Sequence, residues 1–181
     1  MIIPRTDVAS TFSTSKKSMH LLITIKSSCQ NIERRNAIRE TWGNSDWNRK
    51  HTKFDSKLVF LLAACESTEL EESVRVEDKN YNDLVQWDFQ DSFQNLTVKE
   101  CLFLQFVKNN VSEVTHIFKG DDDVFVNPVA IGNLIDKQPD LDDVFMGSVL
   151  CSSPRITNMR SKYFVPVSLW PAELYKVGFL K

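Results

Sequence analysis

Two short apolar runs constrain the fold of this chain more than any other feature of its sequence. They are residues 21–25 (Leu-Leu-Ile-Thr-Ile) and residues 58–64 (Leu-Val-Phe-Leu-Leu-Ala-Ala). Runs of this length and β-rich character predict strands that are buried on both faces. Stretches with helical spacing separate them, and helices that cover both faces of such strands predict an α/β fold with a mostly parallel sheet.

The other elements are predicted from hydrophobic periodicity and from residues that end helices. Helical spacing occurs in four stretches, residues 31–42, 66–77, 92–109 and 128–137. Four short β-rich stretches predict further strands, at residues 83–89, 115–119, 144–149 and 162–165.

Two polar stretches and one helix face complete the expected layout. Residues 1–18 are expected to form an irregular lead-in and residues 44–57 a loop. In the helix at 92–109, one broad buried stripe is predicted. Its members are Phe93, Leu96, Cys101, Leu104 and Val107.

The composition excludes several classes of protein. Of the 181 residues, 42% are hydrophobic and 25% are charged, which is the balance of an ordinary globular chain. The net charge of −2 provides no general basic field for nucleic acid. The sequence contains no apolar run of about 18 residues, so it predicts no membrane span.

The cysteines leave their own pairing open. Cys29, Cys65, Cys101 and Cys151 are widely spaced, so a zinc site is not expected. They allow two disulfides in three alternative pairings, or buried free thiols. Glycosylation sequons begin at Asn95 and Asn110, although the first falls in a strongly helical stretch.

Three adjacent aspartates carry the clearest functional pattern in the chain. Asp121, Asp122 and Asp123 follow the apolar run at 116–118 and precede another at 124–126. Extended geometry would place Asp121 and Asp123 on one face and Asp122 on the other. Two carboxylates on one side suit a hard divalent ion such as Mn²⁺ or Mg²⁺, which typically bridges protein oxygens and a diphosphate. The alternative is a solvated acidic turn in which one aspartate caps a local bend.

A second pattern lies in the helix at 31–42. Arg35 and Arg39 are four residues apart and share a helix face, where they could bind phosphate or ribose oxygens. The alternative is that both are surface arginines that pair with Glu40 or with acids on other elements, and spacing alone favours this interpretation. Trp42 is expected to anchor the core.

Several segments, taken in order, resemble a known family. The segments are residues 22–27, 35–43, 59–62, 91–100, 118–127 and 162–166. Together they resemble the animal β-1,3-glycosyltransferases of the galactosyltransferase type. The Lys-Gly-Asp-Asp-Asp form at 119–123 is most similar to the β-1,3-N-acetylglucosaminyltransferase branch.

This resemblance implies a GT-A fold, a UDP-sugar donor and Mn²⁺ (or Mg²⁺) held through the aspartate triplet. It implies that Asp123 contacts the metal directly and that Asp121 contacts both the metal and the nucleotide. Asp122 belongs to the same nucleotide motif. Lys26, Arg35 and Arg39 match the family's nucleotide-side motif on the first strand and helix.

The implied reaction is inverting transfer of N-acetylglucosamine or galactose to a β-1,3 linkage. The implied acceptor is a glycan on a glycoprotein or glycolipid, and the implied setting is the lumenal side of the Golgi membrane. The membrane would be reached only through an anchor that this sequence does not contain.

The sequence departs from the family after residues 162–166. Only residues 178–180 match the family's glycine-rich turn, and its later acidic segment and metal-binding histidine do not occur. Residues 19–181 are therefore expected to be the nucleotide-sugar-binding part of a catalytic domain truncated at its C-terminal side, with the catalytic base beyond the chain end. The alternatives are a truncated non-catalytic chain that keeps only metal, UDP or partner binding, and an acidic cation-binding module without a nucleotide.

Overall fold

The structure, a computed structural model, describes residues 19–111, 113–137, 144–175 and 179–180. The chain divides into two compact units, residues 1–137 and residues 138–181, which are described separately below. The predicted lead-in at 1–18 lies outside the described residues. The assignment of residues 19–181 to one part of a catalytic domain stays a prediction.

The first unit alternates strands and helices, as the apolar runs predict. Its elements are β1 (His20–Lys26), α1 (Ile32–Glu40), α2 (Ser45–His51), β2 (Asp55–Ala64), α3 (Thr68–Tyr81), β3 (Leu84–Gln90), α4 (Leu96–Asn110), β4 (His116–Asp121) and α5 (Pro128–Asp136). The four strands form one sheet in the order β3-β2-β1-β4, and every neighbouring pair is parallel. This confirms the predicted α/β class and is consistent with a GT-A-like fold.

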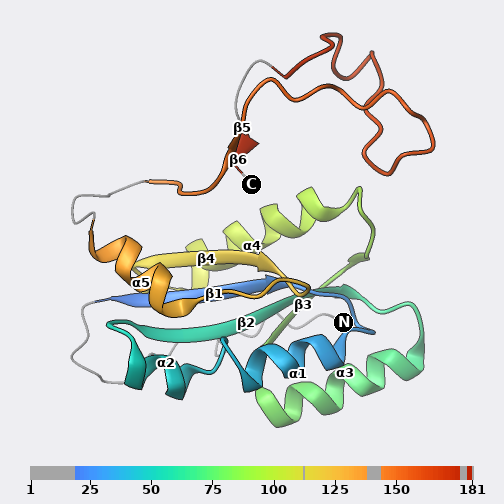
Figure 1. Cartoon of the computed structure of the whole chain (residues 1–181). Helices are drawn as coiled ribbons and strands as arrows, with labels where there is room; N and C mark the ends of the chain where they lie inside the picture. Colours follow the sequence, from blue (N-terminus) through green and yellow to red (C-terminus); the bar gives the residue numbers. More distant parts are fainter. Residues whose placement is uncertain (1–18, 112, 138–143, 176–178, 181) are drawn as a thin grey trace. The chain divides into compact units, whose positions relative to one another are not determined.

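Helices cover both faces of this sheet. In Figure 1, α1, α2 and α3 lie on one face and α4 on the other. Leu21, Ile23 and Ile25 of β1 belong to the cluster that includes Trp42, whereas Leu22 belongs to the cluster of α4. Alternate side chains of one strand therefore enter two different cores. Trp42 is buried, which confirms it as a core residue.

The parallel pairing brings the strand ends together. Because all four strands run the same way, the last residues of β3, β2, β1 and β4 lie at one edge of the sheet. The chain moves from β1 outward through β2 to β3, and then returns to place β4 on the other side of β1. The carboxyl ends of β1 and β4 therefore define the switch point of the sheet, where α/β proteins bind ligands.

Two expectations about the first unit are wrong. Residues 44–57 are not a loop, because they contain α2 and the start of β2. Asn44 begins α2 by accepting a hydrogen bond from the backbone N–H of Trp47, a local capping contact that compensates for the lack of an apolar stripe.

The buried stripe predicted for α4 is also wrong. Leu104 is 55% exposed and Cys101 is exposed, whereas Lys99, Phe103 and Phe106 are the buried residues of the helix. Apolar side chains occur around most of α4, so their spacing alone does not identify the face that contacts the sheet.

The second unit contains little regular structure in its described residues. A two-residue strand, β5 (Val149–Leu150), pairs antiparallel with β6 (Phe179–Leu180). The strand predicted at 144–149 is wrong over most of its length, and the one predicted at 162–165 is replaced by a turn. Both runs have β-rich composition, but the structure gives neither a partner strand over the predicted length, and a strand needs one.

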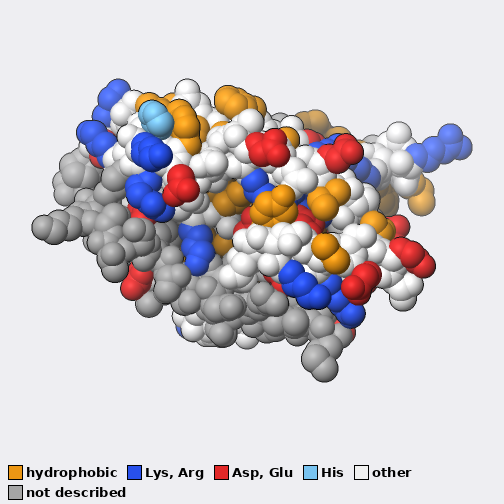
Figure 2. Space-filling model, turned by 90° about the horizontal axis from the view of Figure 1, so that it is seen from below, with side chains coloured by type: hydrophobic (Ala, Val, Ile, Leu, Met, Phe, Trp, Pro, Cys, Tyr) orange, Lys and Arg blue, Asp and Glu red, His pale blue; other side chains and the backbone are white. Residues whose placement is uncertain are grey.

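Surface charges in the first unit are of mixed sign. On the face shown in Figure 2, acidic and basic side chains lie among one another rather than in a patch of one sign. Over the described part of the chain, no helix combines the length and the apolar character needed to cross a bilayer.

Candidate functional site

The aspartate triplet lies at the switch point, but its three carboxylates have different surroundings. β4 ends at Asp121, and Asp122 and Asp123 form the turn that follows. The extended geometry assumed for the triplet therefore does not continue past Asp121. The side chain of Asp122 is 8% exposed, that of Asp121 is 60% exposed, and Asp123 is exposed.

Protein donors surround the Asp122 carboxylate. It accepts hydrogen bonds from Ser27 Oγ at 2.6 Å and from Asn31 Nδ2 at 2.8 Å. Arg34 Nη1 donates to its other oxygen at 3.0 Å. All three donors come from the segment that connects β1 to α1 and from the start of α1. Asp122 therefore joins the end of β4 to this segment, and its carboxylate is the least available of the three to a ligand.

Lys26 lies beside the triplet. It is the β1 residue in register with Asp121, and its Nζ lies 3.2 Å from an Asp121 carboxylate oxygen. Glu100 of α4 lies 3.6 Å from the same Nζ. The structure thus places this predicted nucleotide-side cation next to the carboxylates of Asp121 and Glu100.

The chemistry of these groups fits a hard divalent ion. Carboxylate oxygens are the preferred protein ligands of Mg²⁺ and Mn²⁺. Within the described ranges, no group of three or more histidine, cysteine or acidic side chains is arranged to hold a metal ion. Asp121 and Asp123 would therefore supply only part of a coordination shell, and the remaining ligands would be oxygens of a bound diphosphate and of water.

Arg35 is paired inside the protein. Its side chain is fully buried, and Nε and Nη2 donate to the two carboxylate oxygens of Glu77 at 2.7 and 2.6 Å. Glu77 lies on α3, so this bidentate pair links α3 to α1. The structure thus shows the pairing with acids that was the alternative for this residue, in the interior rather than at the surface.

Arg39 extends the same network. It donates to Glu77 and, through two nitrogens, to the Asp83 carboxylate at 2.7 and 2.8 Å. Its guanidinium also lies over the rings of Phe60 and Tyr81, 4.8 and 4.0 Å from their centroids. Arg39 is therefore paired with two carboxylates and packed against two aromatic rings.

The charges of this network shift two pKa values. Burial raises the pKa of Glu77, but the hydrogen bonds and charges of Arg35 and Arg39 outweigh this effect, and the pKa lies below its ordinary value. Burial likewise lowers the pKa of Arg39, and the carboxylates of Asp83 and Glu77 raise it above its ordinary value. Both shifts favour the charged forms of Glu77 and Arg39 at neutral pH.

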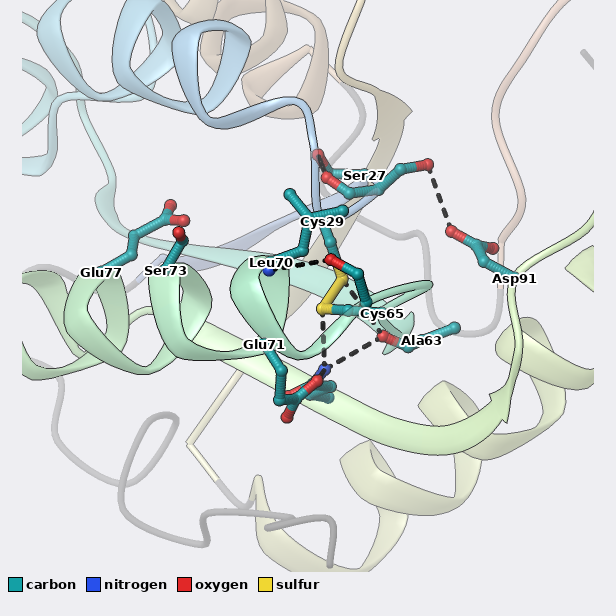
Figure 3. Close-up of a disulfide and its surroundings, with 12 residues drawn as sticks. Ser27, Cys29, Ala63, Cys65, Leu70, Glu71, Ser73, Glu77 and Asp91 are labelled. Atoms are coloured by element: carbon teal, nitrogen blue, oxygen red, sulfur yellow. Dashed lines mark hydrogen bonds between the residues drawn. A yellow bond between two sulfur atoms is a disulfide. The ribbon is translucent and has the colours of Figure 1, made fainter.

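A pocket of about 310 Å³ opens at the carboxyl ends of β1, β2 and β3. The residues that line it are Ser28, Cys29, Gln30, Ala64, Cys65, Glu66, Asp91, Ser92, Phe93 and Leu96. A disulfide between Cys29 and Cys65 forms part of its wall and joins the ends of β1 and β2 (Figure 3). The structure thus contains one disulfide rather than two, and Cys101 and Cys151 are free thiols that are exposed rather than buried.

Several residues of this region are not evident from the sequence patterns. Ser27 and Asp91 directly follow β1 and β3, and Asn31 directly precedes α1, so the rule that ligands bind at the carboxyl ends of parallel strands could have identified this region. Glu77 and Lys99 lie within helices, where a single charged residue has no distinguishing pattern.

A parallel sheet covered by helices on both faces, with acidic and polar groups at its switch point, defines an α/β protein of the nucleotide-binding kind. The chain belongs to the Galactosyltransferase family, which matches residues 33–178. This confirms the resemblance found in the sequence.

Curated relatives agree with this assignment. The chain is 36% identical over 160 residues to lactosylceramide 1,3-N-acetyl-beta-D-glucosaminyltransferase of Xenopus tropicalis, covering 86% of this chain and 42% of the relative. It is 36% identical over 162 residues to UDP-GlcNAc:betaGal beta-1,3-N-acetylglucosaminyltransferase 7 of Rattus norvegicus, covering 87% and 41%. It is 33% identical over 175 residues to human acetylgalactosaminyl-O-glycosyl-glycoprotein beta-1,3-N-acetylglucosaminyltransferase, covering 91% and 45%. The chain thus spans less than half the length of these relatives.

Proposed function

We propose that this chain contributes the donor-binding part of an inverting hexosyltransferase, which transfers N-acetylglucosamine from a UDP-sugar to a β-1,3 linkage on a glycan. The observation that carries the proposal is the pair of exposed carboxylates at the switch point, Asp121 and Asp123, the first of which lies 3.2 Å from Lys26 Nζ. Family membership supports the reaction class, and one relative bears the name of a UDP-GlcNAc-dependent transferase.

The proposal gives the triplet a divided role. Asp123 and Asp121 hold Mn²⁺ or Mg²⁺, and Lys26 lies next to Asp121 on the nucleotide side. When bound, the ion supplies Lewis-acid chemistry that offsets the charge developing on the diphosphate. Asp122, which is already satisfied by protein donors, fixes the turn that presents the other two aspartates.

The pocket beside the disulfide is the proposed place for the nucleoside. Its volume lies at the lower end of the range typical of small-molecule sites. Its wall combines apolar groups such as Leu96 with the polar side chains of Ser28 and Asp91, which can hydrogen-bond a base or a ribose. The proposal does not place Arg35 and Arg39 on the nucleotide, because both guanidinium groups are paired with the buried carboxylate of Glu77, and that of Arg39 also with Asp83.

The acceptor is proposed only as a class. The names of the relatives specify a lactosylceramide, a β-galactoside and an O-glycosylated glycoprotein, while all three transfer N-acetylglucosamine. The part that these proteins share with this chain therefore fits a common donor better than a common acceptor. We propose a glycan on a glycoprotein or glycolipid as the acceptor, and assign no residue of this chain as the catalytic base.

The disulfide bears on the proposed location. Disulfides persist in oxidising compartments and are rare in reducing ones, so the Cys29–Cys65 bond supports a lumenal setting. We propose the lumenal side of the Golgi membrane.

Thermal denaturation tests the proposal. UDP with MnCl2 at about 100 times its Kd should stabilise the chain by about 2.7 kcal/mol, a rise in Tm of roughly 5–11 °C. Asp123→Asn should abolish the rise that UDP and MnCl2 produce together. Asp46→Asn, a matched change of an exposed aspartate on α2, should retain it.

Two results would contradict the proposal. One is stabilisation by Ca²⁺ alone with no effect of UDP, which would identify an acidic cation-binding module. The other is an unchanged response to UDP and MnCl2 in Asp123→Asn.

A further inference from the structure

The loop between β1 and α1 is held by two buried cations. Three successive backbone carbonyls of this loop accept hydrogen bonds from them. Lys99 Nζ donates to the carbonyl of Ser27 at 3.2 Å. Arg35 Nη1 donates to the carbonyl of Ser28 at 2.6 Å, and Arg35 Nη2 donates to that of Cys29 at 3.2 Å.

These cations reach the loop from opposite faces of the sheet. Arg35 lies on α1, on the face that α3 also covers, and Lys99 lies on α4. Their side chains are 0% and 2% exposed. Each has a carboxylate partner, Glu77 for Arg35 and Asp91, at 3.0 Å, for Lys99. Burying the charges of Arg35 and Lys99 costs desolvation free energy. Replacing such a buried ion pair with apolar residues of similar volume would often stabilise the fold more.

Hydrogen bonds through Ser27 connect this loop to the aspartate triplet. Arg35 Nη1 donates to Ser27 Oγ at 3.0 Å, so this hydroxyl accepts from Arg35. A serine hydroxyl has a single proton to donate, and Ser27 Oγ lies 2.6 Å from the Asp122 carboxylate. The contact with Arg35 therefore directs the hydroxyl proton toward Asp122.

The loop also forms part of the pocket wall. Ser28 Oγ donates to the Asp91 carboxylate at 3.1 Å, and the other oxygen of that carboxylate accepts from Lys99 at 3.0 Å. Lys99 therefore contacts both the Ser27 carbonyl, next to the pocket residue Ser28, and the side chain of Asp91, which lines the pocket.

We propose that Arg35 and Lys99 are positioning residues that hold the loop at 27–29 from both faces of the sheet and thereby set Asp122 and the pocket wall for the donor nucleotide. Glu77 acts through Arg35, and Asp91 through Lys99. The inference rests on the proposed function for its ligand, but the hold on the loop is a separate claim that can be measured without a ligand.

The test compares Lys99→Met with Asp83→Asn in the 181-residue chain. Lys99→Met removes the ammonium group and keeps an unbranched apolar side chain. Asp83→Asn weakens the same kind of buried network at Arg39, without touching the loop. Ser27→Ala is a milder third variant that removes only the hydroxyl contact with Asp122, so it keeps the test decisive if Lys99→Met fails to fold.

The first readout is amide hydrogen exchange without ligand. In Lys99→Met, exchange of the amides at 27–31 should rise about tenfold or more relative to the amides of β2, because the loop loses one of its two anchors. In Asp83→Asn the ratio should stay at the wild-type value. An unchanged ratio in Lys99→Met would overturn the proposal.

The second readout is affinity for UDP in the presence of MnCl2. Lys99→Met and Ser27→Ala should bind about 10–100-fold more weakly, the loss typical of groups that orient ligand-binding residues, and Asp83→Asn should bind as the wild type does. Wild-type affinity in Lys99→Met and Ser27→Ala would overturn the proposal. If the wild-type chain itself does not bind UDP, the proposed function fails, and hydrogen exchange alone decides the claim about the loop.

Discussion

Replacing Glu77 with alanine should be among the most destabilising single changes in the first unit. The side chain of Glu77 is 1% exposed, and its two oxygens accept three hydrogen bonds, two from Arg35 and one from Arg39. After the substitution, Arg39 keeps Asp83, but Arg35 is left as a buried cation with only hydroxyl and carbonyl partners.

The size of the expected loss of stability follows from the buried charge that Arg35 keeps without a carboxylate partner. Removing one partner of a buried ion pair costs about 3–5 kcal/mol, because the remaining charge stays desolvated. At 1.36 kcal/mol per tenfold, this shifts the unfolding equilibrium by about 150- to 5,000-fold. For a chain of this length it corresponds to a fall in Tm of roughly 6–20 °C. Asp83→Asn should cost less, about 1–3 kcal/mol, since Arg39 retains Glu77.

Urea denaturation at pH 7, monitored by tryptophan fluorescence, measures the difference in unfolding free energy between the two variants. Trp42 and Trp87 are buried in the first unit and report its unfolding. The reasoning predicts that Glu77→Ala has a lower midpoint than Asp83→Asn, with similar slopes for both variants. A loss below about 1 kcal/mol for Glu77→Ala, as for an exposed pair, would refute the claim that this network carries a large part of the stability.

Three other predictions concern pH, the disulfide and the core. Because the pKa of Glu77 lies below its ordinary value of 4.5, its stabilising contribution is complete above pH 4.5 and is lost as the pH falls through the folded-state pKa. The stability difference between the wild type and Glu77→Gln, measured by urea denaturation from pH 7 to pH 3, should therefore shrink below pH 4.5, and a constant difference would contradict this. Replacing both Cys29 and Cys65 with alanine should cost about 4 kcal/mol, since the bond closes a loop with a sequence separation of 36. The melting temperature of the double variant should be insensitive to dithiothreitol, and that of the wild type should fall in it. Phe103→Ala should cost about 3–5 kcal/mol and Leu104→Ala less than about 0.5 kcal/mol, and the reverse order in chemical denaturation would contradict the face of α4 described above.

The sequence was sufficient to predict the central sheet. The runs at 21–25 and 58–64 are nearly uninterrupted because both of their faces are buried, and this property distinguishes a parallel sheet from an exposed antiparallel one. The strands predicted at 144–149 and 162–165 lacked such support, because short β-rich runs become strands only where a partner is present. In α4 the kind of element was predictable, but its buried face depends on the sheet that it contacts.

The candidate site was predictable in part for a similar reason. The triplet at 121–123 stands out because three adjacent carboxylates lie between two apolar runs. The pairing of Arg35 with Glu77 was not predictable, because the two residues are 42 positions apart and meet only when α1 and α3 pack together. Helical spacing shows that Arg35 and Arg39 share a face, but it does not show that this face points inward.

Calorimetric titration of the chain with UDP and with UMP, each with and without MnCl2, tests the central claim most directly. We expect binding of one UDP per chain that requires Mn²⁺, and much weaker binding of UMP, since an ion held as proposed by Asp121 and Asp123 would favour a diphosphate over a monophosphate. Equal affinity for UDP with and without Mn²⁺, or no binding of UDP at all, would contradict the assignment of this sheet edge to a nucleotide-sugar donor.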